Sequence, residues 1–534
     1  MIGTISITEV LTMKKRILLL VLALLVILAG CQNPGSTIPT TVPSYTQPSV
    51  TTPATTEPVC PAHSDENGDD ICDSCGSSVI IVIDFYCIND LHGRVLASTA
   101  QPGIDEMTTY LQQAKETDDH VILLSAGDMW QGSAESNLTR GKLVVEWMNR
   151  LGFHGMALGN HEYDWGERYI AENAELAQFP FLAINVYDAA TNTRADYCES
   201  SRLVEVNGVQ VGLIGAIGDC HSSIAKEMGQ GVYFKAGPAL TQLVKAESEA
   251  LRQQGADFIV YLIHDGMGSS SYGGTMNVPA HQLTSYYDIS LSNGYVDLVF
   301  EGHTHQRYLG KDQYGVYHLQ HRGDNTGGLS HVEISIHAIS GAVEVRQAEL
   351  IQSDKYEHLD DSPMIQQLLD EYDAEIGSAI DICGKAAHSV PGNDLRQLVA
   401  DLYYMEGFAR WGMEYDIALG GGFVSIRQPG YLANGEVAYG DLLELFPFDN
   451  ELVLCTISGR DLRTRFLETD NSNYFVCCDE SITDNIDDTA TYYVVVDTYT
   501  STYAPNRLTE VERYGAPYYA RDLLANYIRN GGLN

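Results

Sequence analysis

Short apolar runs separated by helix-length segments dominate the chain from residue 79 to about residue 300. The runs are rich in Val, Ile and Leu, as buried strands are, and lie at 79–83, 121–124, 211–216, 258–263 and 296–300. Helical patterns fill the intervals 105–115 and 237–254. Buried strands that alternate with helices predict a layered α/β domain whose strands end in functional loops.

A second region follows a helical pattern at 362–379. It combines a helical pattern at 395–407 with strand-like runs at 451–457 and 492–496. With 534 residues the chain is also too long for one ordinary core. We therefore expect a first domain over 78–351, a linker helix within 352–385, and a separate α/β or α+β domain over 386–534.

The first 31 residues have the layout of a secretory signal peptide. Basic residues at 14–16 precede an unbroken apolar run at 17–28, which is too short and wrongly flanked for a stable transmembrane span. The small residues before Cys31 resemble a bacterial lipobox, which predicts acylation of Cys31 and an extracytoplasmic protein lipid-anchored to the bacterial cell membrane. An ordinary signal peptide cleaved near Gly30 is the alternative. Residues 32–58, rich in Thr, Pro and Ser, predict an extended tether.

A short cysteine-containing segment at 59–77 separates this tether from the first domain. Cys60, His63, Cys72 and Cys75 have the CxxH…CxxC arrangement of a tetrahedral zinc site. The acidic residues between them also resemble the oxygen ligands of a calcium loop. A disulfide-closed knuckle without metal is the alternative outside the cell. A structural zinc or calcium ion is therefore one expectation for this segment, and no catalysis is expected.

The charge balance excludes one class of function. The chain has 71 acidic and 31 basic side chains, a formal net charge of −40. A surface this negative repels polyanions, so binding to a nucleic acid duplex is not expected. A phosphate site on such a protein needs its own positive field, from metal ions or clustered arginines.

Polar clusters follow the predicted strands of the first domain. In chain order they are Asn89-Asp90-Leu91-His92, Gly127-Asp128, Asn160-His161-Glu162 with Asp164, His264-Asp265, and His303-Thr304-His305. Carboxylate, imidazole and carboxamide donors together suit divalent metal ions. A single His after a strand is usually structural, and a Gly-Asp pair is usually a turn. Five such clusters at successive strand ends predict a metal site.

The order of these motifs resembles the calcineurin-like metallophosphoesterases, and its detail resembles the 5′-nucleotidase family. The detail consists of Gln131-Gly132 after Asp128, and of Asn160-His161-Glu162-Tyr163-Asp164. The resemblance covers roughly residues 80 to 510. It implies a four-layered α/β/β/α sandwich for the first domain and a C-terminal α/β (α+β) domain that binds substrate.

The resemblance also implies two divalent metal ions, each with three ligands of its own and one shared carboxylate. The ligands are Asp90, His92 and His305 for one ion, Asn160, His264 and His303 for the other, and Asp128 between them. Zn²⁺ or Mn²⁺ is expected, because imidazole-rich sites disfavour Mg²⁺. His161 then acts on the phosphate, and Asp164 fixes its tautomer. For Asp164 a helix N-cap is the alternative.

In the C-terminal domain the resemblance implies Arg427 as a phosphate ligand, Phe448 as a base-stacking ring and Asn450 as a reader of the base edge. Arg396 is a second candidate cation. The chain departs from the family at Gly420, where Asn is usual, and in the three residues 423–425 before Ile426. The family's late segment, an aromatic residue followed by Gly-Gly-Asp, is also missing. Tyr499 or Tyr503 then provides the second aromatic ring that sandwiches the base, or both are ordinary aromatic residues.

These features predict an extracytoplasmic 5′-nucleotidase that releases nucleoside and phosphate. A 2′,3′-cyclic nucleotide phosphodiesterase, a UDP-sugar hydrolase and a sulfur-ester hydrolase on the same scaffold are the alternatives among enzymes. A surface lipoprotein with a vestigial metal site is the alternative among binding proteins. The expected partners are a nucleotide substrate and, through the lipid anchor, a membrane. The family architecture further implies a hinge near 352–385.

Overall fold

The computed structural model describes residues 64–533, apart from gaps at 98–102, 119, 225–227, 267–271, 276–294, 313, 324–326, 428, 470–471, 479–481, 483–484, 504–507 and 515–517. The predicted signal peptide, the lipidation site Cys31, the tether, and the candidate ligands Cys60 and His63 lie outside the described residues. Within the described part of the chain, no helix has the length and apolar character needed to cross a membrane.

Two β-sheets pack face to face in the first domain. The strand order is β15-β14-β1-β2-β3-β4 in one sheet and β10-β12-β13-β11-β9-β7-β6 in the other. The first contains β1 (Ile80–Ile88), β2 (Val121–Ser125), β3 (Gly155–Ala157), β4 (Phe181–Leu182), β14 (Leu329–His337) and β15 (Val343–Ile351). The second contains β6 (Ser201–Val206), β7 (Val209–Ile217), β9 (Phe258–His264), β10 (Tyr272–Thr275), β11 (Leu298–Glu301), β12 (Tyr308–Lys311) and β13 (Tyr317–Gln320). β5 (Val186–Asp188) and β8 (Val232–Phe234) form a separate pair.

Strand β1 shows why the sheets stack. Its side chains alternate, so Ile83 and Phe85 point into the core between the two sheets. Tyr86 and Ile88 point to the opposite face, into the core beneath the helices. A strand that is buried on both faces is apolar along most of its length, which is the pattern that the sequence shows.

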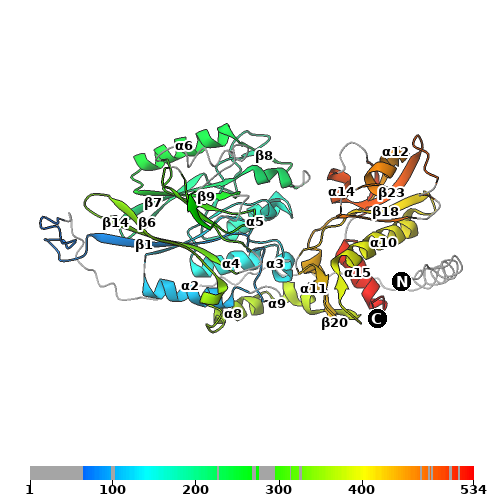
Figure 1. Ribbon diagram of the computed structural model, residues 1–534, viewed down its shortest axis with the longest axis horizontal. Coiled ribbons are helices and arrows are strands. Elements are labelled where there is room, and N and C mark those ends of the chain that lie inside the picture. The colour runs from blue at the N-terminus through cyan, green and yellow to red at the C-terminus, as the bar shows by residue number, and fades with distance from the viewer. Residues whose placement is uncertain are drawn as a thin grey trace, which may run out of the picture. The chain divides into compact units, whose positions relative to one another are not determined.

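Helices cover the outer faces of both sheets. Against the first sheet lie α2 (Asp105–Thr117), α4 (Lys142–Leu151), α5 (Glu167–Leu176) and α8 (Pro363–Glu371). Against the second lies α6 (Pro238–Gln253). Short helices α3 (Ala134–Thr139), η1 (His161–Tyr163) and η2 (Asp219–Ser223) follow strand ends. Figure 1 shows the order α6, second sheet, first sheet, and then α2, α4 and α8, so the predicted four-layered α/β/β/α sandwich is confirmed.

The predicted linker helix is divided into several pieces. The segment contains η4 (Ser353–Lys355), α8, α9 (Asp373–Ile376) and η5 (Gly377–Ile380). Helix α8 begins at Pro363 after an N-cap in which the Ser362 side chain accepts from the Met364 amide. Strand β16 (Ile382–Ala386) follows and pairs with β20 (Gly435–Ala438), so this end of the segment belongs to the second domain.

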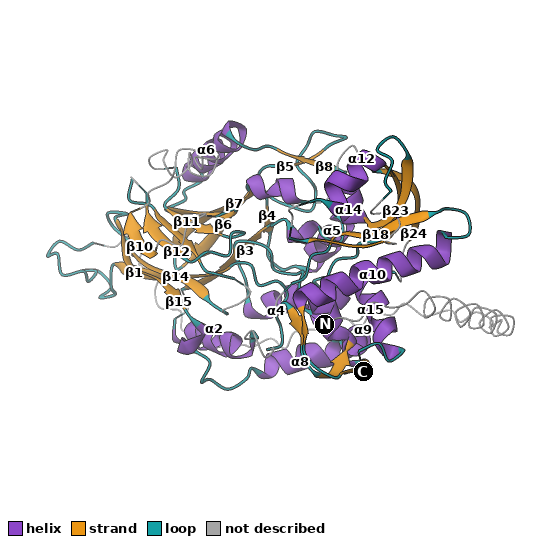
Figure 2. Cartoon of the chain, turned by 45° about the vertical axis from the view of Figure 1, so that its right-hand side comes forward, coloured by secondary structure: helices purple, strands orange, loops and turns teal. Residues whose placement is uncertain are grey.

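The second domain is built on a five-stranded sheet of order β22-β18-β23-β21-β24. Its strands are β18 (Ile417–Phe423), β21 (Leu452–Ser458), β22 (Tyr474–Cys478), β23 (Thr491–Asp497) and β24 (Thr509–Tyr514), and β17 (Val390–Pro391) pairs with β19 (Tyr431–Leu432). Helices α10 (Gly392–Trp411), α11 (Tyr439–Leu445) and α15 (Ala520–Arg529) pack on one face of the sheet, and α12 (Gly459–Leu462) and η6 (Arg463–Leu467) pack on the other. Figure 2 shows α10 and α12 on opposite sides of β18 and β23. Helix α14 (Thr498–Tyr503) follows β23 directly.

Candidate functional site

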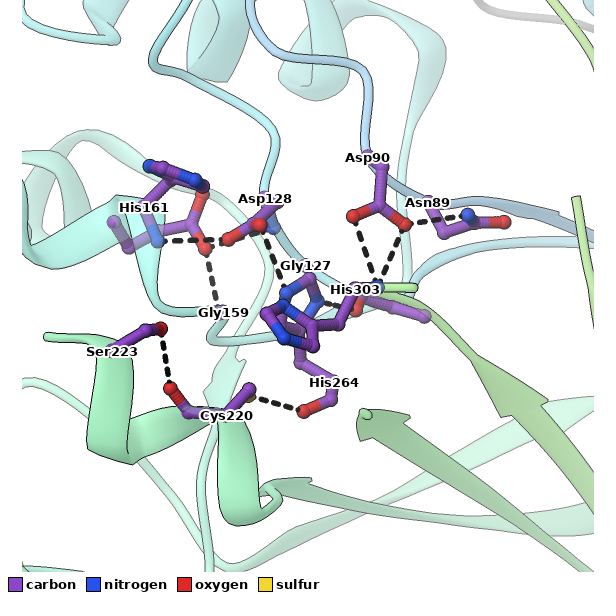
Figure 3. A network of polar contacts seen from close by, with 12 residues as sticks. Asn89, Asp90, Gly127, Asp128, Gly159, His161, Cys220, Ser223, His264 and His303 are labelled. Atoms are coloured by element: carbon purple, nitrogen blue, oxygen red, sulfur yellow. Dashed lines mark hydrogen bonds and ion pairs between the residues drawn. The ribbon is translucent and has the colours of Figure 1, made fainter. Parts of the chain in front are cut away.

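The carboxyl ends of five parallel strands bring the predicted metal ligands together. Asp90, Asp128 and Asn160 follow β1, β2 and β3 of the first sheet, and His264 and His303 lie at or just after the ends of β9 and β11 of the second. Carboxyl ends of parallel strands share an edge, so ligands far apart in the chain become neighbours. Figure 3 shows Asp90, Asp128, His264 and His303 converging on one point.

The donor atoms of the first predicted ligand trio lie close together. Nε2 of His92 lies 3.1 Å from Nε2 of His305, and Nε2 of His305 lies 3.3 Å from Oδ1 of Asp90. The donor atoms of all three residues lie within 4.8 Å of one another. Two ring nitrogens and a carboxylate oxygen this close have the composition of a metal-binding trio.

The second predicted trio lies beside Asp128. Nε2 of His264 is 2.9 Å from Oδ2 of Asp128, and the rings of His264 and His303 are 5.5 Å apart between centroids. Oδ1 of Asn160 is buried and has no hydrogen-bond partner among the described residues. A buried carbonyl oxygen without a partner is costly, so this atom fits the predicted role of a metal ligand.

Asp128 belongs to donor groups on both sides of the cluster. One group joins it to Asp90 and His264, and another joins it to His92 and His161. This position is the one required of a carboxylate shared between two ions. The seven residues therefore fit two divalent ions with nitrogen and oxygen donors.

The backbone at these ligands adopts a conformation that non-glycine residues avoid. Five of the seven have positive φ: Asp90 (52°), His92 (50°), Asp128 (54°), His303 (74°) and His305 (51°). The left-handed region costs a residue with a Cβ roughly 1–2 kcal/mol. Such conformations persist where the surrounding structure enforces them, and they concentrate at functional sites.

The histidine rings are oriented by hydrogen bonds through Nδ1. Nδ1 of His92 lies 2.9 Å from the Gln131 carbonyl oxygen, and Nδ1 of His264 lies 2.7 Å from the Ala126 carbonyl oxygen. A ring that donates from Nδ1 to a carbonyl presents Nε2 to a metal ion. Burial lowers the pKa of His92 to about 3 and the pKa of His303 to about 4, whereas the Asp128 carboxylate outweighs burial and raises the pKa of His264 to about 10.

Glu162 holds the loops that carry the ligands. Its Oε2 accepts the amides of Asp128 (2.9 Å) and Gly159 (2.6 Å), and its Oε1 accepts the amide of Met129 (2.8 Å). Three donors on one buried carboxylate tie the loop after β2 to the loop after β3. The sequence motif contains Glu162, but nothing in its pattern gave it this role.

His161 stands between the two domains. Its Nδ1 lies 2.6 Å from Oδ2 of Asp164, and its Nε2 lies 2.8 Å from Nη2 of Arg427 in the second domain. Since the guanidinium donates to Nε2, the ring donates to Asp164 through Nδ1–H. Asp164 therefore orients the ring as expected, and the N-cap of the next helix, α5, is Gly166 instead.

A cavity of about 480 Å³ extends from the metal ligands into the second domain. Both domains line it, with the first contributing Asn160, His161, Asp164 and His303, and the second contributing Phe423, Arg427, Phe448, Asn450, Asp497 and Tyr499. Residues 62–534 form a single unit, so this cavity lies within one body. Four of the six predicted substrate ligands thus share one space with the metal ligands.

The remaining predictions for substrate binding have different outcomes. Arg396, on α10, donates to Oδ1 of Asn393 (2.9 Å) and is not among the described residues that line the cavity. The side chain of Tyr503 lies outside the described residues. The ring of Phe423, which the sequence marked only as a departure from the family, lies 5.2 Å from that of Tyr499 and forms a cavity wall.

The cysteine segment is described only from residue 64. Cys72 is buried and Cys75 is exposed, and neither belongs to a candidate metal group within the described residues. The carboxylate of Asp65 accepts the amides of Gly68, Asp69 and Asp70, so it closes a turn. The predicted zinc or calcium ion stays a prediction.

Cys220 lies beside the predicted metal ligands, and no sequence pattern had pointed to this cysteine. Its thiol donates to the His264 carbonyl oxygen, with sulfur and oxygen 2.8 Å apart, and its sulfur lies within 4.8 Å of ring nitrogens of His264 and His303. Figure 3 shows it beneath the His264 ring. Cys220 lies in η2 after β7, and no local motif distinguishes it from the other cysteines.

Two family models match the chain. Residues 83–307 match "Calcineurin-like phosphoesterase", and residues 378–482 match "5'-nucleotidase, C-terminal domain". The chain is also 25% identical over 411 residues to Endonuclease YhcR of Bacillus subtilis, covering 70% of this chain and 32% of that protein. It is 28% identical over 224 residues to a 5'-nucleotidase of Vibrio cholerae, covering 41% and 39%. The matches thus span about a third of these relatives' length.

Solved structures share the fold. A 5'-nucleotidase precursor from Thermus thermophilus superimposes with a TM-score of 0.60 at 18% identity, over 85% of this chain and 97% of that one. A putative 5'-nucleotidase from Staphylococcus aureus gives 0.63 at 18% identity, over 85% and 98%. At these identities the likeness shows that both domains and their arrangement along the chain are shared.

Proposed function

We propose, on the premise that this chain belongs to the 5′-nucleotidase family of calcineurin-like metallophosphoesterases, that it hydrolyses nucleotide phosphoesters to nucleoside and phosphate. The observation that carries the proposal is the shared cavity, in which Asn160 and His303 of the ligand cluster face Arg427, Phe448 and Asn450. A phosphate at the ligand cluster leaves its nucleoside beside an aromatic ring and a carboxamide. That pairing suits a nucleotide better than a simple phosphoester.

Metal ions bound at this cluster would supply Lewis-acid catalysis and an activated water. Two divalent ions, held by Asp90, His92 and His305 and by Asn160, His264 and His303, with Asp128 shared, would activate water and neutralise charge on the phosphoryl oxygens. Imidazole nitrogens and carboxylate oxygens favour Zn²⁺ or Mn²⁺. The chain's own task is then positioning and electrostatic stabilisation.

Arg427 and His161 provide the remaining positive field. The guanidinium donates to Nε2 of His161 at 2.8 Å, and Asp164 receives the Nδ1 proton at 2.6 Å. A phosphate oxygen that enters the cavity accepts the Arg427 donors in place of the imidazole. Nε2 of His161 then faces the phosphate and, when protonated, donates to a phosphoryl or leaving-group oxygen.

We propose an extracytoplasmic, lipid-anchored location for the protein. The proposal rests on the basic residues 14–16, the apolar run 17–28 and the small residues before Cys31. In a bacterial host, radiolabelled palmitate is expected in the wild-type protein and not in Cys31→Ser. Equal labelling of the two proteins excludes Cys31 as the lipidation site, and no labelling of either excludes the anchor.

A substrate panel tests the reaction. Substrate loss and products are measured by chromatography with nucleoside mono-, di- and triphosphates, 2′,3′-cyclic nucleotides, UDP-glucose and p-nitrophenyl phosphate, after loading with Mn²⁺ or Zn²⁺. Chromatography is needed because cleavage of one ester bond in a cyclic nucleotide or in UDP-glucose releases no free phosphate. We expect the highest kcat/KM for a 5′-nucleotide and no activity for Asp128→Ala. A preference for cyclic nucleotides or UDP-glucose reassigns the substrate. No turnover of any phosphoester by metal-replete protein refutes the proposal and favours a binding lipoprotein.

A further inference from the structure

The loop at 446–450, between α11 and β21, carries both predicted nucleoside contacts, Phe448 and Asn450. Arg521 of α15 binds both the backbone and one carboxylate of this loop. Its guanidinium donates to the carbonyl oxygens of Phe446 (3.2 Å) and Phe448 (2.8 Å) and pairs with the carboxylate of Asp449. The Arg521 side chain is only 5% exposed, so the loop is fixed to a buried cation.

The same carboxylate also contacts the first domain. Oδ1 of Asp449 faces Arg521, and Oδ2 lies 2.8 Å from Nη2 of Arg140. Arg140 ends helix α3, which packs beside α11 (Figure 1). Asp449 is 15% exposed, and both of its oxygens are therefore engaged by arginines from different domains.

Arg140 itself is held in place. Its backbone is left-handed, with φ of 53°. Its guanidinium lies over the rings of Trp165 (5.3 Å) and Tyr169 (5.6 Å), a cation–π arrangement. Trp165 directly follows Asp164, the residue that orients His161. One chain of contacts thus runs from the phosphate end of the cavity, through Arg140 and Asp449, to the loop at its nucleoside end.

The two ion pairs differ in what they do. The Asp449–Arg521 pair lies inside the second domain and compensates a buried charge, so its loss leaves a cation without a counter-charge. The Arg140–Asp449 pair is partly exposed, with Arg140 30% accessible, and contributes little to folding. Its geometric effect is to fix the loop relative to the metal ligands.

We propose that Asp449 is a positioning residue for nucleoside recognition and that Arg140 links it to the catalytic domain. Asp449 contacts no substrate in this scheme. It sets the distance from Phe448 and Asn450 to the metal ligands, so that a nucleoside and its phosphate reach both ends of the cavity together. The proposal rests on the proposed nucleotidase function, because it requires a substrate that spans the cavity.

Arg140→Met tests the link, since it removes the charge and keeps an unbranched apolar side chain over Trp165 and Tyr169. Kinetic constants are measured for the best nucleotide of the panel and for p-nitrophenyl phosphate, which has no nucleoside. We expect kcat/KM for the nucleotide to fall about tenfold, mainly through KM, which corresponds to about 1.4 kcal/mol. For p-nitrophenyl phosphate we expect a change of less than about twofold, and Arg140→Lys should recover most of the loss.

Arg168→Met is the matched control. Arg168 forms an exposed ion pair with Glu172 on α5 and lies over Tyr169 as Arg140 does, but it contacts neither Asp449 nor the cavity. We expect wild-type constants for both substrates. Asp449→Asn should show the same substrate-dependent loss, together with a lower melting temperature because Arg521 loses its counter-charge.

The outcomes separate the two proposals. Equal losses for both substrates in Arg140→Met, or no loss for either, overturn the positioning role while nucleotide hydrolysis by the wild type stands. A wild-type protein that hydrolyses p-nitrophenyl phosphate but no nucleotide overturns both proposals. A loss in Arg140→Met that appears in kcat alone, with unchanged nucleotide KM, also contradicts the positioning role.

Discussion

At the scale of single residues, several side chains hold the candidate metal ligands in position and are not themselves candidate ligands. Glu162 accepts three backbone amides from two loops, and Asn89 donates to Oδ2 of Asp90 (2.7 Å). The Asp90 carboxylate also accepts a hydrogen bond from the backbone amide of His303. Such contacts hold the left-handed backbone of the ligands in place, because strained conformations persist only where several contacts enforce them.

Glu162→Gln is expected to destabilise the protein and weaken metal binding. A carboxamide turns one of its two ends into a donor, so at least one of the three amides loses its acceptor, at a cost of about 1–3 kcal/mol. Thermal unfolding and metal titration check this result. Glu172→Gln, an exposed change on α5, is the control. Unchanged stability and metal affinity in Glu162→Gln would show that the loops are held by other contacts.

His161→Ala is expected to lower kcat by about 10²- to 10⁴-fold, the range for loss of a positioned proton donor. Metal content should stay at the wild-type value, because neither ligand trio includes His161. Activity on the best nucleotide and metal analysis by mass spectrometry check the two parts. The donor atoms of His161 also lie within 4.8 Å of those of His92 and Asp128. Loss of metal from this variant would therefore reassign His161 as a ligand.

At the scale of elements, packing around α2 places a carboxyl group in an unfavourable position. Asp105, in the first turn of α2, has its pKa raised to about 6 by burial, with Asp361 and Glu106 adding repulsion. Asp361 lies in the segment before α8, which α2 also contacts through a hydrogen bond from Thr109 to the Asp360 carbonyl oxygen (2.8 Å). The two elements thus bring like charges together.

Asp105→Asn is expected to raise the melting temperature at neutral pH and to have little effect below about pH 4. Between the ordinary pKa of 3.8 and the folded value of about 6, the folded state binds more protons than the unfolded state. Stability from this group therefore falls as pH rises through that window, and the amide removes the penalty. Melting curves at several pH values check the result, with Glu116→Gln on the exposed face of α2 as control. A pH-independent difference would assign the effect to helix capping instead.

At the scale of the whole molecule, the ligands join two sheets and the cavity joins two domains. His264 and His303 come from the second sheet and Asp90 and Asp128 from the first, so ions bound by these residues would cross-link the sandwich. Arg427 contacts His161, and Arg94 pairs with Glu444 (3.0 Å), across the domain boundary. Metal binding and domain contact should therefore both contribute to stability.

Removal of metal with a chelator is expected to lower the melting temperature of the wild-type protein by several degrees. Ions that bind only the folded state stabilise it by mass action, by about 4 kcal/mol at a thousandfold excess over Kd. Differential scanning calorimetry with and without added Zn²⁺ or Mn²⁺ measures the change. Asp128→Ala should not respond to either ion. An equal response in that variant would place the stabilising ions elsewhere in the chain.

Apolar runs followed by polar clusters were enough to predict a layered α/β domain with a metal site at its strand ends, and the family resemblance added the four-layered sandwich and the assignment of the ligands. The clusters that contain Asp90, Asp128 and His264 could be predicted to meet, because parallel strands bring their carboxyl ends to one edge whatever their exact register. The predicted strands were correctly placed, although β1 extends to Ile88, because apolar runs of Val and Ile are typical of doubly buried strands. The single linker helix was predicted less well, because a helical pattern does not fix where the chain breaks.

Which distant side chains meet follows from the packing of the two domains and not from any local pattern. Arg427 reaches His161 across 266 positions of sequence, and Asp449 joins Arg140 to Arg521, while Arg396 is absent from the described cavity lining. Local patterns report which face of an element is buried, and carry no information on which segment covers it. The candidate metal ligands follow strand ends of a single domain and could therefore be predicted from the sequence. The other end of the cavity, lined by the second domain, depends on how the two domains pack.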